Sequence, residues 1–211
     1  MSAFHRPPAR AVRAAGIRGH KQQVEEIDIA MFTGFAVSSP PRLFCELAGL
    51  LSLEELICAG DYLLWWRQPK ASPEDLRAAV GRYAGRLGRA ELEDALPELS
   101  DRSDSPPESK IRFRFGRAGL PDLAVNQEIY SSSGVFLAMP DLAFIRYKMV
   151  LDYEGDHHRS DKRQWRKDLK RVPRLEDAGW HSTRISADDI WDSTELIDRL
   201  KRLLRARGWS G

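Results

Sequence analysis

Acidic residues gather around two strand-like segments near the middle of the chain. Asp141 follows an apolar run over 135–140, and Asp152 and Glu154 lie within a second run over 149–154. A polar turn separates the two runs, so we expect them to form paired strands. Side chains alternate across a strand, which places Asp152 and Glu154 on the same face. Paired strands would bring all three carboxylates together.

Three carboxylates at one sheet edge repel each other unless a cation lies between them. Oxygen ligands of this kind suit Mg²⁺ or Mn²⁺ better than zinc. We therefore predict that Asp141, Asp152 and Glu154 bind a divalent metal ion. Such an ion can hold a phosphodiester and activate a water molecule. Glu154 could alternatively orient the base instead of binding the metal.

The residues that follow could supply the remaining groups of a hydrolytic site. His158 is the best candidate for the general base, because its pKa lies near neutrality and it follows the strand end closely. Arg159 and Arg171 could contact the phosphate. Residues 158–174 hold eight Arg or Lys against two Asp, which is a local basic strip in a chain of net charge +2. A role of this strip on a DNA backbone would depend strongly on salt.

The acidic segment resembles a known nuclease signature. Pro140-Asp141, followed by the run Asp152-Tyr153-Glu154-Gly155-Asp156-His157-His158-Arg159, is similar to the PD-(D/E)xK motif. More narrowly, it resembles bacterial domains grouped with the very-short-patch-repair endonucleases. The resemblance extends from about Asp104 to Trp191 and includes Ser105-Pro106-Pro107-Glu108, Asp168-Leu169-Lys170-Arg171 and Gly179-Trp180. Two departures are present: Glu154 replaces the lysine of the general motif, and the acids at 152 and 154 are exchanged relative to the narrower family.

The resemblance implies a restriction-endonuclease-like α/β fold over residues 101–211, with a mixed central sheet flanked by helices. It also implies a DNA endonuclease that uses Mg²⁺ or Mn²⁺. In such folds a glutamate of the first helix often reaches the metal, which makes Glu108 a candidate. A capping box offers an alternative, in which Glu108 satisfies the backbone N–H of Ser105.

The local pattern predicts the same order of elements. A helix begins at Ser105, a first core strand covers 123–130, and a helix covers about 160–177. A strand over 180–186 and a final helix over 193–207 complete the domain. Projection of the 160–177 helix places Asp168 on the face toward the sheet, where it could orient His158 or Arg171, or simply pair with Arg171 or Arg184. Pro173 should break or kink this helix.

The N-terminal half reads as a separate, helix-rich region. Residues 1–22 resemble a loose tail, and the polar stretch Leu99–Pro107 marks the domain boundary, so residues 23–100 form the region between. Two short strands and then four helices are expected, the helices over 42–51, 52–66, 72–85 and 89–99. The part that begins at Ser38 weakly resembles the C-terminal portion of abortive-infection antitoxins.

These features favour a divalent-metal-dependent DNA endonuclease of repair or defence type. The alternative is a catalytically silent module with a nuclease fold that binds DNA or regulates a toxin–antitoxin system. RNA as substrate and a homodimer are both left open. Cys45 and Cys58 match no zinc pattern and read as reduced thiols, and the sequence contains no long apolar run or signal core. We therefore expect a cytoplasmic protein with no membrane partner.

Overall fold

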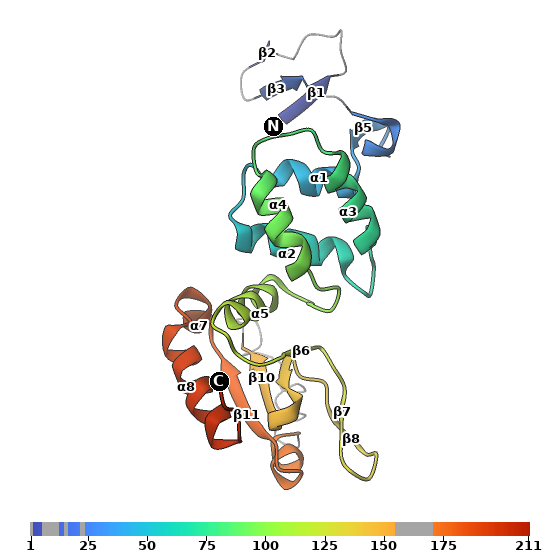
Figure 1. Cartoon of the computed structure of the whole chain (residues 1–211). Helices are drawn as coiled ribbons and strands as arrows, with labels where there is room; N and C mark the ends of the chain where they lie inside the picture. The colour runs from blue at the N-terminus through green and yellow to red at the C-terminus, as the bar shows by residue number, and fades with distance from the viewer. Residues whose placement is uncertain (1, 6–12, 15–16, 22–23, 155–170) are drawn as a thin grey trace. The chain divides into compact units, whose positions relative to one another are not determined.

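The chain folds into two compact units, each assembled from two stretches of sequence. A computed structural model describes all residues except 1, 6–12, 15–16, 22–23 and 155–170 (Figure 1). The first unit comprises Met1–Leu56 and Lys70–Pro97, and the second comprises Ile57–Pro69 and Glu98–Gly211. The boundary expected near residue 101 lies close to the division after Pro97. The inclusion of Ile57–Pro69 in the second unit was not expected.

Helices dominate the first unit. They are α1 (Pro40–Leu47), the first turn of α2 (Leu53–Leu64), α3 (Pro73–Arg82) and α4 (Arg89–Ala95), which continues into the 3-10 turn η2 (Leu96–Glu98). Local sequence sets these limits: Ser72 and Asp75 form a reciprocal capping box at the start of α3, next to Pro73. Gly88 before α4 has φ +76°, and an added Cβ would lie 2.4 Å from the backbone of Ala48. All four helices expected between residues 42 and 99 are present.

Short strands precede these helices. The expected loose tail contains, in its described part, the strands β1 (Ser2–His5), β2 (Arg13–Ala14) and β3 (Ile17–Lys21), paired in the order β1-β3-β2. After the 3-10 turn η1 (Glu26–Asp28), β4 (Ile29–Phe32) and β5 (Phe35–Ser38) form an antiparallel hairpin. Its turn is Thr33-Gly34, and both residues have positive φ.

A mixed four-stranded sheet is the centre of the second unit. Its strands are β6 (Ala124–Val125), β9 (Leu142–Phe144), β10 (Met149–Tyr153) and β11 (His181–Ile185), in the order β11-β10-β9-β6. β10 and β11 are parallel, whereas β9 pairs antiparallel with both β10 and β6. The predicted α/β class with a mixed central sheet is confirmed at this level.

Helices cover both faces of this sheet. The helices are α5 (Pro106–Arg117), a helical stretch over 171–177, α7 (Ala187–Trp191) and α8 (Thr194–Ala206). One face packs against α5 and α8, where Leu196, Leu200 and Leu204 recur at a helical interval and are buried (Figure 1). The opposite face packs against Leu175 and Trp180. Both faces of the sheet therefore pack against other elements of the part of the chain that the structure describes.

Two strand predictions near the site were wrong. The run over 135–140 does not pair with β10; its strand β8 (Phe136–Ala138) pairs with β7 (Ile129–Tyr130), and β9 takes the place beside β10. Pro140 separates β8 from β9, and proline has no N–H to donate to a sheet. The single strand expected over 123–130 is divided into β6 and β7, because Asn126 has φ 46° and turns the chain.

Candidate active site

Asp141 and Asp152 lie side by side at the ends of β9 and β10. Leu142 faces Leu151 in the antiparallel pair, and the same register continued by one residue places Asp141 opposite Asp152. The backbone N–H of Tyr153 donates to Oδ2 of Asp141 at 2.7 Å. The hydrophobic residues of β9 and β10 fix this register by their burial on both faces, so the two carboxylates are brought together by packing rather than by mutual attraction.

The environment opposes the charged form of both acids. The pKa of Asp141 is raised to about 6; burial is the largest cause, the hydrogen bond from the Tyr153 N–H opposes the rise, and the charge of Glu108 contributes to it. Burial also raises the pKa of Asp152 to about 6; Arg171 lowers that pKa, and the charge of Asp141 raises it. Two half-buried acids that repel each other in this way form a site that a cation would stabilise.

Arg171 contacts this acid pair directly. Its Nη2 atom donates to Oδ2 of Asp152, and both side chains are mostly buried. Arg171 is the first described residue of the helical stretch over 171–177. The sequence predicted that Arg171 acts near the site as a phosphate contact or as a residue oriented by Asp168. In the structure, its guanidinium forms an ion pair with Asp152, one of the candidate metal ligands.

Glu154 does not join the acid pair in a three-carboxylate cluster. Its backbone N–H donates to the carbonyl of Ile185 at 2.8 Å, which extends the parallel pairing of β10 and β11. Its side chain pairs with Nη1 of Arg184, and more than half of that side chain is exposed. In the part of the chain that the structure describes, no group of three His, Cys, Asp or Glu could hold a metal ion. The expected convergence of three carboxylates is therefore not seen among these residues.

Glu108 is buried at the start of α5 and accepts three hydrogen bonds. Oε2 accepts from the backbone N–H of Asp104 at 2.9 Å and from Nδ2 of Asn126 at 2.7 Å, and Oε1 accepts from Oγ of Ser105 at 2.6 Å. Burial raises the pKa of Glu108, and these hydrogen bonds oppose that shift. The capping role predicted from sequence takes a different form, because Glu108 reaches the N–H of residue 104 rather than that of Ser105.

Asn126 connects this cap to the acid pair. Its backbone N–H donates to the carbonyl oxygen of Asp141 at 2.9 Å. Its side-chain Nδ2 donates to Oε2 of Glu108 and to the carbonyl oxygen of Arg102. Asn126 was not among the predicted site residues. It lies inside the single strand expected over 123–130, and the available signal was its residue type, because asparagine tolerates the left-handed conformation that the turn requires.

Glu108→Gln should lower stability without weakening metal binding. The amide of glutamine would direct N–H groups at donors that now approach the carboxylate, which costs about 1–3 kcal/mol. Urea unfolding measures this loss, and Mg²⁺-dependent thermal stabilisation measures binding. If Glu108→Gln instead abolished the response to Mg²⁺ while leaving urea stability unchanged, Glu108 would be a metal ligand rather than a cap.

The remaining predicted site residues lie outside the described residues. They are His158, Arg159 and Asp168, together with Asp156 and His157 of the motif-like run. The predicted start of the helix at about residue 160 also falls there. Pro173 lies within the described helical stretch over 171–177, so the break predicted near residue 172 is not seen in that stretch.

Comparisons with known proteins found two distant relatives. The uncharacterized proteins MT2308 and Rv2248 of Mycobacterium tuberculosis, strains CDC 1551/Oshkosh and H37Rv, are each 25% identical to this chain over 177 residues. The match covers 83% of this chain and 64% of each relative, so the chain spans less than two thirds of their length. No family model matches the chain, and no solved structure matches it. Among the helices of the described residues, none is both long and apolar enough to span a membrane.

Proposed function

We propose that the chain is a Mg²⁺-dependent DNA endonuclease whose second unit has a PD-(D/E)xK-like, very-short-patch-repair-like core. The observation that carries this proposal is the pair of adjacent, half-buried carboxylates Asp141 and Asp152, each with a pKa raised to about 6. Such acids are costly to keep ionised at neutral pH, and perturbed carboxylates of this kind concentrate at functional sites.

The order of elements supports the proposed core. Along the chain, and leaving aside the β7–β8 hairpin and the short helix α7, α5 is followed by β6, β9 and β10, then by the helical stretch over 171–177, then by β11 and α8. This is the α-β-β-β-α-β-α order that the resemblance implies. In this arrangement the acids stand at the strand ends, where a nucleic-acid backbone could approach without entering the core.

The residues present fit a magnesium ion. Mg²⁺ commonly uses one or two carboxylates and keeps water or phosphate oxygens in its other positions. Asp141 offers Oδ1, since Oδ2 accepts from the Tyr153 N–H, and Asp152 offers Oδ1 beside the oxygen held by Arg171. When bound, Mg²⁺ would supply electrophilic activation of a phosphate and of a water molecule.

The residues of the chain would then have separate roles. Asp141 and Asp152 hold the cation site, and the Tyr153 N–H fixes the orientation of the Asp141 carboxylate. Arg171 carries a permanent positive charge and would contact a scissile phosphate that approaches Asp152. His158 is the proposed general base, and Arg159 and Asp168 are the proposed phosphate contact and orienting acid; DNA is the proposed partner.

A cleavage assay with matched variants tests the proposal. Labelled single-stranded, duplex and mismatched DNA, with RNA in parallel, would be incubated with the full chain in Mg²⁺, Mn²⁺ or EDTA. We expect metal-dependent cleavage that falls by about a hundredfold or more in Asp141→Asn and Asp152→Asn. Asp122→Asn is the control, because Asp122 is an exposed acid of the same unit. Cleavage that persists in both site variants would refute the assignment.

One observation favours a second function, a nuclease-fold module that binds DNA without cutting it. The Arg171–Asp152 ion pair neutralises one of the two acids without a metal. A silent module would bind DNA equally well in Mg²⁺ and in EDTA, and Asp141→Asn would leave that binding unchanged. Absence of cleavage together with such binding would favour this alternative over the endonuclease.

A further inference from the structure

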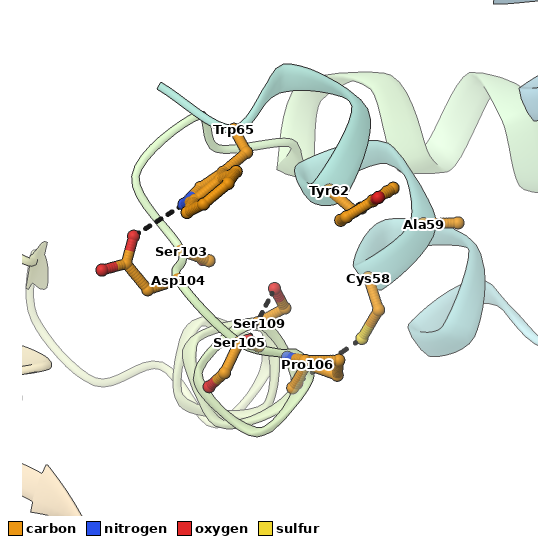
Figure 2. Close-up of a pocket in the computed structure, with 9 residues that line it drawn as sticks. All are labelled: Cys58, Ala59, Tyr62, Trp65, Ser103, Asp104, Ser105, Pro106 and Ser109. Carbon is orange, nitrogen blue, oxygen red and sulfur yellow. Dashed lines mark hydrogen bonds between the residues drawn. The ribbon is translucent and has the colours of Figure 1, made fainter. Parts of the chain in front are cut away.

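A cavity in the second unit lies between the C-terminal part of α2 and the segment that leads into α5. Its volume is about 360 Å³, within the usual range for small-ligand sites. Most of its surface is apolar, and Figure 2 shows the side chains arranged around an open centre. The lining residues are Cys58, Ala59, Tyr62, Trp65, Ser103, Asp104, Ser105, Pro106 and Ser109.

Two of the serines in the lining are buried and poorly hydrogen-bonded. Ser103 is 5% exposed, and its Oγ has no hydrogen-bond partner among the described residues. Ser109 is also buried, and among the described residues its Oγ donates one long hydrogen bond, of 3.5 Å, to the carbonyl of Ser105. A buried hydroxyl without a partner costs free energy, and a ligand that offers a donor or acceptor would recover it. The cavity therefore suits an apolar ring with a polar edge.

Two aromatic rings line the cavity, and two arginines contact a neighbouring tryptophan. Tyr62 and Trp65 contribute two rings from α2 and the residue that follows it. The neighbouring Trp66 is contacted by two guanidinium groups, with Arg67 4.5 Å and Arg102 4.8 Å from its ring centroid. Asp104 pairs with Arg67, but no ion pair involves Arg102 among the described residues. A ligand with an aromatic ring and an attached phosphate matches this combination.

The cavity wall also belongs to the network around the acid pair. Asp104 and Ser105 line the cavity and donate hydrogen bonds to Glu108. Asn126 donates to Glu108 through its side chain and to the carbonyl oxygen of Asp141 through its backbone N–H. A ligand in the cavity would therefore contact the same hydrogen-bonded network that reaches Asp141 through Glu108 and Asn126.

From these observations we propose that the cavity holds one unstacked nucleobase of a bound nucleic-acid strand. The base lies against Tyr62 and Trp65, its polar edge bonds Ser103 Oγ, and its phosphate lies toward Arg102. Aromatic contacts of this kind bind bases with little sequence preference. The inference rests on the proposed function for its choice of ligand, but its test requires no cleavage.

Cys58 provides a built-in reporter for the cavity. Its sulfur lies 3.6 Å from the carbonyl of Pro106 within the lining. Cys45 is fully buried, and burial raises the pKa of its thiol to about 12, so it should not react with iodoacetamide. The rate of alkylation of the folded chain therefore reports access to Cys58.

The experiment measures this rate in EDTA with three probes: oligothymidylate of about 12 nucleotides, an abasic strand of the same length, and thymidine monophosphate. We expect oligothymidylate to slow alkylation and to bind about fivefold to a hundredfold more tightly than the abasic strand. Ser103→Ala should weaken binding of oligothymidylate by about threefold to tenfold. Protection by the monophosphate alone would overturn the strand proposal in favour of a free nucleotide.

A pair of tyrosine variants separates the cavity from general DNA binding. Tyr62 is 59% exposed and Tyr130 is 51% exposed, so either can be shortened without opening a core. Tyr62→Ala should abolish the preference for the base-bearing strand, whereas Tyr130→Ala should keep it. Equal protection by the base-bearing and abasic strands, or equal effects of the two tyrosine variants, would refute a base in the cavity. Because EDTA prevents metal-dependent cleavage in this assay, failure of the endonuclease proposal would not produce these results.

Discussion

Asp141→Asn is expected to stabilise the metal-free protein at neutral pH while removing its response to Mg²⁺. Burial raises the pKa of Asp141 from 3.8 to about 6 in the folded state. The folded state therefore binds a proton more tightly than the unfolded state, and stability falls as the pH rises from the unfolded to the folded pKa. A tenfold change in proton affinity corresponds to about 1.4 kcal/mol, so asparagine should gain about 1–3 kcal/mol once the acid is ionised.

The pH dependence separates this effect from a general change in packing. Below about pH 4 the acid is protonated in both states and the variant should have no advantage; the gain should develop up to about pH 6 and stay constant above it. Urea unfolding across this range, with and without Mg²⁺, measures both effects, and Asp122→Asn is the exposed control. A variant that is less stable than the wild type at neutral pH would show that Asp141 is a structural acid.

Asp61→Ala is expected to destabilise the second unit by about 3–5 kcal/mol, the usual loss when one partner of a buried ion pair is removed. Asp61 is 1% exposed in α2 and accepts from Nη2 of Arg112 at 2.9 Å and from the backbone N–H of Ser100 at 2.7 Å. In the variant, the mostly buried guanidinium of Arg112 would lose this ion pair, and its charge would be costly to keep out of water. Chemical unfolding measures the loss, and Asp122→Ala should change stability little.

A double substitution tests whether charge burial is the cause. Asp61→Leu combined with Arg112→Met removes both charges and leaves apolar side chains in their place. It should be more stable than Asp61→Ala, because a buried pair can be replaced by apolar groups at little net cost. If the double variant lost at least as much stability as Asp61→Ala, the hydrogen bond from Ser100 would be the dominant contribution.

The sequence predicted the elements near the site better than their pairing. Alternation and burial correctly identified β10, and the acids at 141 and 152 were expected to approach each other. The two acids are adjacent because β9 pairs with β10, however, and β9 is only Leu142–Phe144. The sequence pattern favours the longer apolar run before Pro140 as the partner strand instead. A three-residue strand has too little pattern to be recognised locally, since its pairing is decided by burial on both faces.

Long-range contacts explain the other differences. Nothing in local spacing indicates that Arg184 faces Glu154, because the parallel pairing of β10 with β11 sets this contact from thirty residues away. The cap at Glu108 was readable from the Ser-x-x-Glu spacing, but its link to Asn126 was not. The cavity could not be predicted, because Tyr62 and Trp65 come from a helical segment that the sequence assigned to the other region.

The discontinuous second unit constrains how the protein could evolve. Ile57–Pro69 belongs to the same unit as Glu98–Gly211, although residues 70–97 separate them in sequence. A recombination event near residue 98 would transfer the acid pair but leave behind Asp61 and the aromatic residues of the cavity. The transferred gene segment would encode the sheet and α5, but Arg112 of α5 would lack its partner Asp61. Shuffling at the apparent domain boundary should therefore be selected against, and the two halves of the gene should be inherited together.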